Sequence, residues 1–176
     1  VLCAVLEDQL KSKGLFKINM RFTGFRRRNK IDGFSNVNGR INVLDKKAFK
    51  ADPIKLIKIF YEAQRYNLDI HPNAIRLISE NIRLVNNSLR NSDKANEVFL
   101  EILTAKTNPE QALRLMNEAG VLGKFIPDFG RVVAQMQYDM YHTYTVDEHT
   151  IRAIGILSRI ENGTYSEDMK NSSEAM

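Results

Sequence analysis

The sequence predicts a mainly α-helical fold: a compact bundle of about six to eight helices with one small β-hairpin at about residues 34–43. Three observations support this class. Helix-start signals recur from Asp52 onward, and apolar residues follow them at the spacing of one helix face. The connections between these helices are short, as they are in compact bundles. One Asn38-Gly39 pair lies between two short arms and predicts the hairpin turn.

Residues 1–30 are expected to hold the end of a helix and a basic linker. The chain opens with VLCAVLEDQLK, which has no basic region ahead of its apolar residues and so does not resemble a signal peptide. We expect it to continue a helix that begins upstream, which would make the chain a piece of a longer protein. Of the 26 basic residues, eight lie between Gln9 and Ile31 with no acidic residue, which leaves 18 basic against 21 acidic elsewhere. The basic character therefore belongs to segment 11–30.

Four residue pairs predict the starts of four helices, because each combines a capping residue with a proline or an acid that suits the first turn. These pairs are Asp52-Pro53, His71-Pro72, Ser92-Asp93 and Asn108-Pro109. After the second start, apolar residues keep the spacing of one helix face as far as Leu89. Gly120 is expected to end the fourth helix.

The C-terminal part is expected to hold a compact turn, a short helix and a final long helix. The turn is predicted for VLGKFIPDFG and the short helix for RVVAQMQYDM. The final helix is predicted from about Val146 to Asn162, with Gly163 at its end and a polar tail after it.

Several functional classes are excluded by the composition. The single cysteine, Cys3, rules out a disulfide framework and a paired-cysteine zinc site, and it favours a cytoplasmic location. No glycine-rich phosphate loop and no HExxH motif is present. No apolar run approaches the roughly 20 residues of a spanning helix, so we expect no membrane partner.

The start of the last helix carries the strongest local motif. Thr145 and Glu148 fit a capping box, in which the Thr145 hydroxyl accepts from the Glu148 amide and the Glu148 carboxylate reaches back to the Thr145 amide. Asp147 and Glu148 also lie in the first turn, where the helix dipole favours negative charge. Both acids therefore have a structural explanation.

His149 is the candidate metal ligand. On a helix it shares a face with five apolar residues, and we expect this face to be the buried one. The five are Val146, Ala153, Ile156, Leu157 and Ile160. A histidine on a rigid helix can hold a metal, and a hydrogen-bonded core histidine is the alternative. His142 precedes the helix and has no assigned role.

The chain resembles a known family over residues 31–161. The similarity is carried by IDGFSNVNGRINV, LRNSDKANEVFLEILT, MNEAGVLGKFIPDFG and YHTYTVDEHT. These stretches are similar to the central region of the bifunctional uridylyltransferase/uridylyl-removing enzymes, which modify the nitrogen regulatory protein PII. The resemblance implies an end of an upstream region at 1–30, a helical domain at 31–130, and the connection and first helix of an HD-type hydrolase domain at 131–176.

The resemblance also implies a function for the whole enzyme. UMP would move from UTP to a tyrosine of PII and would be removed hydrolytically in response to glutamine, with Mg²⁺ or another divalent metal as cofactor. His149 matches the first metal-binding histidine of the HD ligand set, but the later His-Asp pair is absent from these residues. We therefore expect neither catalytic centre nor a bound metal in this chain, and nucleic acid is not an expected partner.

A second hypothesis comes from segment 11–30. Its basic residues, with Phe16, Phe22 and Phe25 between them, would suit a stand-alone helical module that binds an acidic or nucleic-acid partner. A longer reading frame with transferase and hydrolase motifs on either side would favour the enzyme instead.

Overall fold

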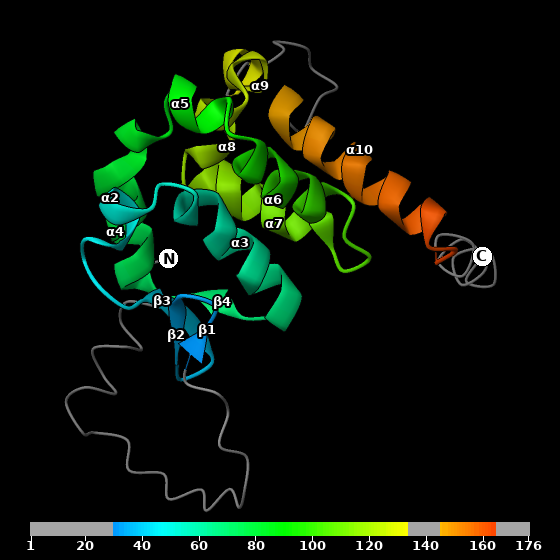
Figure 1. The fold of residues 1–176 in the computed structure, drawn as a ribbon. Helices are drawn as coiled ribbons and strands as arrows, with labels where there is room; N and C mark the ends of the chain where they lie inside the picture. The colour runs from blue at the N-terminus through cyan, green and yellow to red at the C-terminus, as the bar shows by residue number, and fades with distance from the viewer. Residues whose placement is uncertain (1–29, 134–144, 165–176) are drawn as a thin grey trace, which may run out of the picture.

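The fold is mainly α-helical, as the sequence predicts, and the computed structural model describes residues 30–133 and 145–164 (Figure 1). Four predictions lie wholly or mostly outside these residues: the N-terminal helix, the basic segment 11–30, the short helix over RVVAQMQYDM and the polar tail. His142 also lies outside them. No helix in the described ranges is long and apolar enough to cross a membrane.

The predicted hairpin forms and belongs to a four-stranded sheet. The strands are β1 (Lys30–Ile31), β2 (Phe34–Val37), β3 (Arg40–Val43) and β4 (Asp69–Ile70). They lie in the order β1-β2-β3-β4, with antiparallel pairs except for the parallel pair β3–β4. Asn38 and Gly39 have φ angles of 53° and 83°, which is the positive-φ pair that a type I′ turn needs. Phe34 pairs with Val43, and both side chains are buried against the helices.

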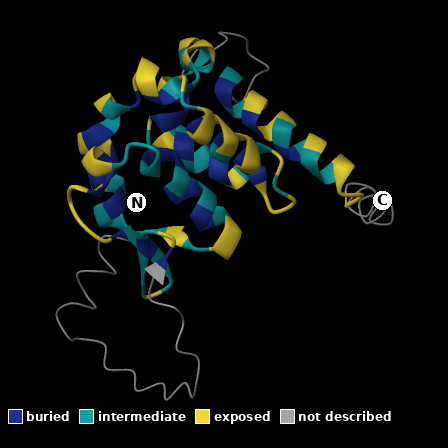
Figure 2. Cartoon of the chain, in the orientation of Figure 1, coloured by how far each residue is buried: buried dark blue, intermediate teal, exposed yellow. Residues whose placement is uncertain are grey.

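The helices pack on one side of this sheet and on one another (Figure 1). They are α2 (Ala48–Ala51), α3 (Lys55–Tyr66), α4 (Pro72–Asn81), η1 (Ile82–Leu84), α5 (Asn87–Arg90), α6 (Asp93–Leu103), α7 (Pro109–Glu118), α8 (Val121–Phe125), α9 (Pro127–Val132) and α10 (Val146–Glu161). The hydrophobic core is continuous from Phe34 on β2 through Phe60 on α3 to Met116 on α7. In Figure 2 the buried faces of these helices turn toward one another.

Two of the predicted caps form with their side chains. The Nδ1 atom of His71 accepts a hydrogen bond from the Asn73 amide at 3.1 Å, and His71 caps α4. Asn108 adopts the left-handed conformation, and its side chain accepts from the Gln111 amide at 3.3 Å. Gly120 ends α7 with a φ of 71°, as predicted.

The helix predicted from Pro72 to Leu89 is interrupted. The α4 helix ends at Asn81, a 3-10 turn follows, and α5 begins after Asn86. The Asn81 side chain donates to the Leu77 carbonyl at 2.8 Å, and the Asn86 side chain accepts from the Leu89 amide. These side chains compete with backbone hydrogen bonding and favour a break, although Val85 and Leu89 remain buried.

The predicted compact turn over VLGKFIPDFG is also wrong in detail, because this stretch forms the two short helices α8 and α9. Their backbones approach closely at two glycines. A Cβ atom on Gly130 would lie 3.1 Å from the carbonyl carbon of Gly123, so a side chain at this position would push the two helices apart. The α10 helix then lies along α7 (Figure 1).

Candidate functional site

The candidate site lies at the start of α10, which begins at Val146 as predicted. Thr145 occupies the N-cap position, but its side chain makes no capping hydrogen bond. The Glu148 carboxylate pairs with the guanidinium of Arg114 on α7 instead of reaching back to the Thr145 amide. The predicted capping box is therefore wrong, because an ion pair across two helices takes the glutamate away from the helix start.

The buried face of α10 also differs from the predicted one. The face toward the protein carries Asp147, Ile151 and Gly155, all of which are buried. His149 and Ala153 are exposed, and Leu157 and Ile160 are 64% and 54% exposed. The predicted stripe therefore points largely to solvent, with His149 on it.

A polar seam holds α10 against α7. We use this name for Glu110, Arg114 and Asn117 of α7 together with Asp147, Glu148, Gly155 and Arg159 of α10. The α7 residues lie four and three positions apart, which places them on one helix face. The helices run antiparallel, since Glu110 at the start of α7 contacts Gly155 and Arg159 while Asn117 near its end contacts Asp147.

Two glutamates and two arginines of the seam form ion pairs with one another. Arg114 donates to Glu110 at 3.1 Å and also pairs with Glu148. Arg159 lies 3.4 Å from the other carboxylate oxygen of Glu110. Burial opposes the charged form of Arg114, but hydrogen bonds and charges from Glu110 and Glu148 outweigh it and raise the pKa of the guanidinium above its ordinary value. These four side chains thus pair with one another while they are partly buried.

A hydrogen bond and a close approach also join the two helices at the seam. The Asn117 amide donates to the Asp147 carboxylate at 2.8 Å, and Asp147 is 5% exposed. At the other end, a Cβ atom on Gly155 would lie 2.9 Å from the Cβ atom of Glu110, which is closer than real Cβ contacts come. Glycine at position 155 therefore lets α10 approach α7.

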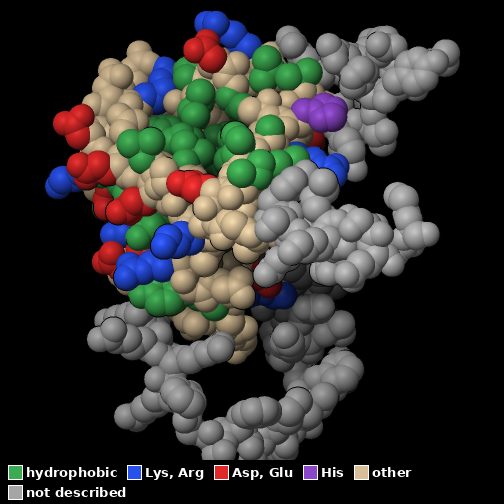
Figure 3. All heavy atoms as spheres, turned by 90° about the vertical axis from the view of Figure 1, so that its right-hand side faces the viewer, with side chains coloured by type: hydrophobic (Ala, Val, Ile, Leu, Met, Phe, Trp, Pro, Cys, Tyr) green, Lys and Arg blue, Asp and Glu red, His purple; other side chains and the backbone are tan. Residues whose placement is uncertain are grey.

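The face of α10 opposite the seam is the apolar face that carries His149. Figure 3 is turned so that α10 faces the viewer, and it shows hydrophobic side chains gathered on this side of the molecule. Among residues 30–133 and 145–164, no group of three histidine, cysteine, aspartate or glutamate side chains is arranged to hold a metal ion. His149 is thus a single ligand-type side chain on an exposed apolar face.

The sequence predicts one helix start that contains Thr145, Asp147, Glu148 and His149. It does not predict the α7 residues of the seam. The Glu110–Arg114 spacing of four predicts an ion pair within one helix. Nothing in the sequence shows that Arg114 also reaches Glu148, which lies 34 residues further along the chain. His71, the other described histidine, caps α4 and belongs to a different element.

Comparison with known proteins identifies a family. A family model described as "Uridylyltransferase GlnD third domain" matches residues 34–125. The bifunctional uridylyltransferase/uridylyl-removing enzyme of Azospirillum brasilense is 50% identical over all 176 residues, which cover 19% of that relative. The enzyme of the same name from Rhodospirillum rubrum is 48% identical, with 18% of it covered. The chain thus spans about a fifth of the length of these relatives, and no solved structure matches it.

Proposed function

Because the chain belongs to the family of the uridylyltransferase GlnD third domain, we propose that it is the helical scaffold of a bifunctional enzyme that uridylylates the protein PII and removes the uridylyl group. UTP would be the donor, a tyrosine of PII the acceptor, and glutamine the signal that favours removal. We expect the enzyme to act in the cytoplasm. The scaffold would join the transferase to the hydrolase and contain neither complete centre.

The observation that carries the proposal is the placement of α10. The polar seam fixes this helix on α7 through ion pairs, and the opposite face with His149 stays exposed. An apolar helix face carrying a histidine suits a partner that buries the apolar residues and completes a metal site. We propose that parts of the parent enzyme outside these 176 residues do both.

In this proposal His149 is the first metal ligand of an HD-type hydrolase. A neutral imidazole nitrogen suits transition metals better than Mg²⁺, which prefers oxygen ligands. One imidazole cannot hold either ion alone, so the remaining ligands must come from other residues of the parent enzyme. When bound, the metal would supply an activated water for hydrolysis of the uridylyl bond. The role of this chain in the site would be to hold one imidazole on a fixed helix.

The proposal is tested in the full-length parent enzyme with His149→Ala. Removal of uridylyl groups from PII should fall by at least about 100-fold, because even indirect partners of metal ligands cost about 10–100-fold. Uridylyl transfer should continue, and the metal content of the purified enzyme should drop.

His71→Asn serves as the matched control. It also removes a histidine, but asparagine preserves the cap of α4. This variant should keep both activities and its metal. If His149→Ala kept full removal activity and full metal content, His149 would not be a ligand and the proposed role of α10 would be wrong.

A further inference from the structure

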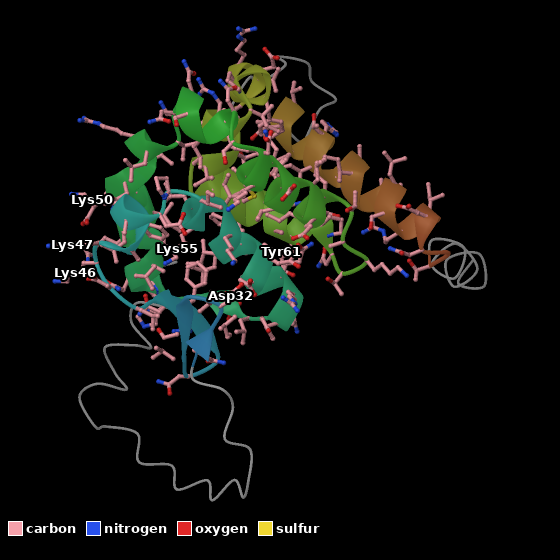
Figure 4. All side chains as sticks on the ribbon, viewed as in Figure 1. Asp32, Lys46, Lys47, Lys50, Lys55 and Tyr61 are labelled. Carbon is pink, nitrogen blue, oxygen red and sulfur yellow. The ribbon has the colours of Figure 1, made fainter. Side chains whose placement is uncertain are left out.

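A basic hollow lies on a part of the molecule that the seam and α10 do not use. Its volume is about 390 Å³, and it lies between the segment that leads into α2 and the C-terminal half of α4. Its walls carry Lys46, Lys47, Lys50, Arg76, Leu77, Glu80 and Asn81. In Figure 4, Lys46, Lys47 and Lys50 project from the same side of the molecule.

The backbone holds these lysines on one turn. The amides of Lys50 and Ala51 donate to the Lys47 carbonyl at 3.0 and 2.9 Å. Lys50 is three residues from Lys47 and four from Lys46, the spacings that make side chains neighbours on a helical turn. Phe49, between them, is fully buried and anchors the turn in the core. The three lysines therefore start from neighbouring positions on one fixed turn, and all three line the hollow.

The charges of the hollow are not balanced. Within the described ranges, no ion pair involves Lys46, Lys47 or Lys50. Arg76, by contrast, pairs with Glu80 and donates to the Asn73 side chain at 3.0 Å. Four cations and one carboxylate give the lining residues a net formal charge of three positive units, and the Asp45 carboxylate beside them accepts a hydrogen bond from the Lys47 amide at 3.2 Å. Like charges held at one place repel one another, and a bound anion would relieve this repulsion.

The chemistry of the walls selects the anion. An ammonium group is a compact point charge with three donors and is a common ligand of phosphate. A phosphoryl group carries a charge of about −1.5 to −2 near pH 7, so the net charge of the hollow matches two linked phosphoryl groups better than one. Glu80 on the α4 wall would repel a broad acidic protein surface, whereas a compact ligand can stay on the lysine side.

We propose that Lys46, Lys47 and Lys50 form a binding site for a condensed phosphate, either free pyrophosphate or the phosphate chain of a nucleotide. The inference uses no residue of α7 or α10. It does not depend on the proposed role of His149, so either can fail without the other.

An NMR titration of the 176-residue chain tests the site. This method reports each residue separately and so distinguishes the hollow from the basic segment 11–30, which also attracts phosphate. Pyrophosphate should shift the amide signals of residues 44–51 and 76–81 with one shared dissociation constant. Raising the salt from about 0.1 M to about 1 M shortens the Debye length from about 10 Å to about 3 Å and should weaken binding.

A comparison of ligands distinguishes free pyrophosphate from the phosphate chain of a nucleotide. UTP and pyrophosphate should bind alike if the phosphates alone are recognised, and UMP should bind more weakly. If UTP bound much more tightly than pyrophosphate, the nucleotide would be the natural ligand of the same phosphate site.

Matched variants locate the site. K46A/K47A/K50A should weaken pyrophosphate binding by about tenfold or more, and the arginine triple variant K46R/K47R/K50R should restore most of it. K94A/K106A/K124A makes the same change in net charge at exposed lysines outside the hollow and should bind like the wild type. Any of three results would overturn the inference. The amide shifts could be confined to residues 11–30, or both alanine variants could weaken pyrophosphate binding equally. The chain could also bind polyglutamate but fail to bind pyrophosphate.

Discussion

Gly155→Ala tests whether the close approach at the polar seam holds α10 in place. The new methyl group would lie 2.9 Å from the Cβ atom of Glu110. The Glu110 carboxylate can rotate away, but its Cβ atom is fixed to α7. The α10 helix must therefore move outward, and the two ion pairs that join the helices, Arg114–Glu148 and Arg159–Glu110, must loosen with it.

Two opposing effects set the magnitude. Alanine is a better helix former than glycine, and this alone would stabilise α10 by about 0.8–1 kcal/mol. Overpacking at a buried contact costs about 1–3 kcal/mol. We therefore expect a net loss of about 1 kcal/mol, or a fall in Tm of about 2–4 °C for a chain of this size.

Urea denaturation measures the net change in the free energy of unfolding. Hydrogen exchange of the α10 amides measures how firmly the seam holds this helix, because a helix can open locally. Ala153→Gly is the control, since this exposed residue lies on the same helix away from α7. It should lose about 1 kcal/mol through helix propensity alone. If Gly155→Ala gained that amount and slowed exchange in α10, the close approach would have no energetic consequence and the reasoning would be refuted.

Two further substitutions test the charges. Arg114→Met should lower the free energy of unfolding by about 1 kcal/mol, as measured by urea denaturation. This loss should be smaller in high salt, because Arg114 is 39% exposed and its ion pairs are screened. Arg131→Met removes an exposed pair with Asp128 and should change stability by less than about 0.5 kcal/mol, so equal losses would contradict the seam. Glu62 is 1% exposed, its carboxylate accepts no hydrogen bond from the described residues, and burial together with Asp32 raises its pKa above 4.5. The folded state then holds a proton that the unfolded state releases, so stability should fall as pH rises above 4.5. Glu62→Gln should remove this fall. If the wild type and the variant lost stability in parallel as the pH rose, the assignment to Glu62 would be wrong.

Local features of the fold could be predicted from the sequence because a few neighbouring residues determine them. Asn38-Gly39 forms the predicted turn because both residues tolerate positive φ angles. His71 and Asn108 cap their helices because their side chains reach amides two or three residues further along. Gly120 ends α7 for the same conformational reason as Gly39.

Contacts between distant residues were not predictable in the same way. Strand β4 is two residues long, and its pairing with Arg40 and Ile41 of β3 leaves no pattern in the sequence. The Asn117–Asp147 hydrogen bond joins residues 30 positions apart, and neither residue type specifies its partner. The break after Asn81 was missed because apolar spacing continues through it, while the side-chain hydrogen bonds that cause it depend on geometry.

The buried face of α10 was predicted wrongly for a different reason, and this reason bears on function. The most apolar face of an amphipathic helix is expected to be buried, yet the face that meets the protein carries ion pairs, Asp147 and a glycine, and Ile151 is its one fully buried apolar side chain. Leu157 and Ile160 remain on the other face, where exposure of apolar side chains costs free energy. A helix with one face matched to α7 and a second, apolar face in solvent is suited to a further partner, and we propose that it has one. His149 is exposed on this second face, and we propose that further residues of the parent enzyme cover it there and share it as a metal ligand.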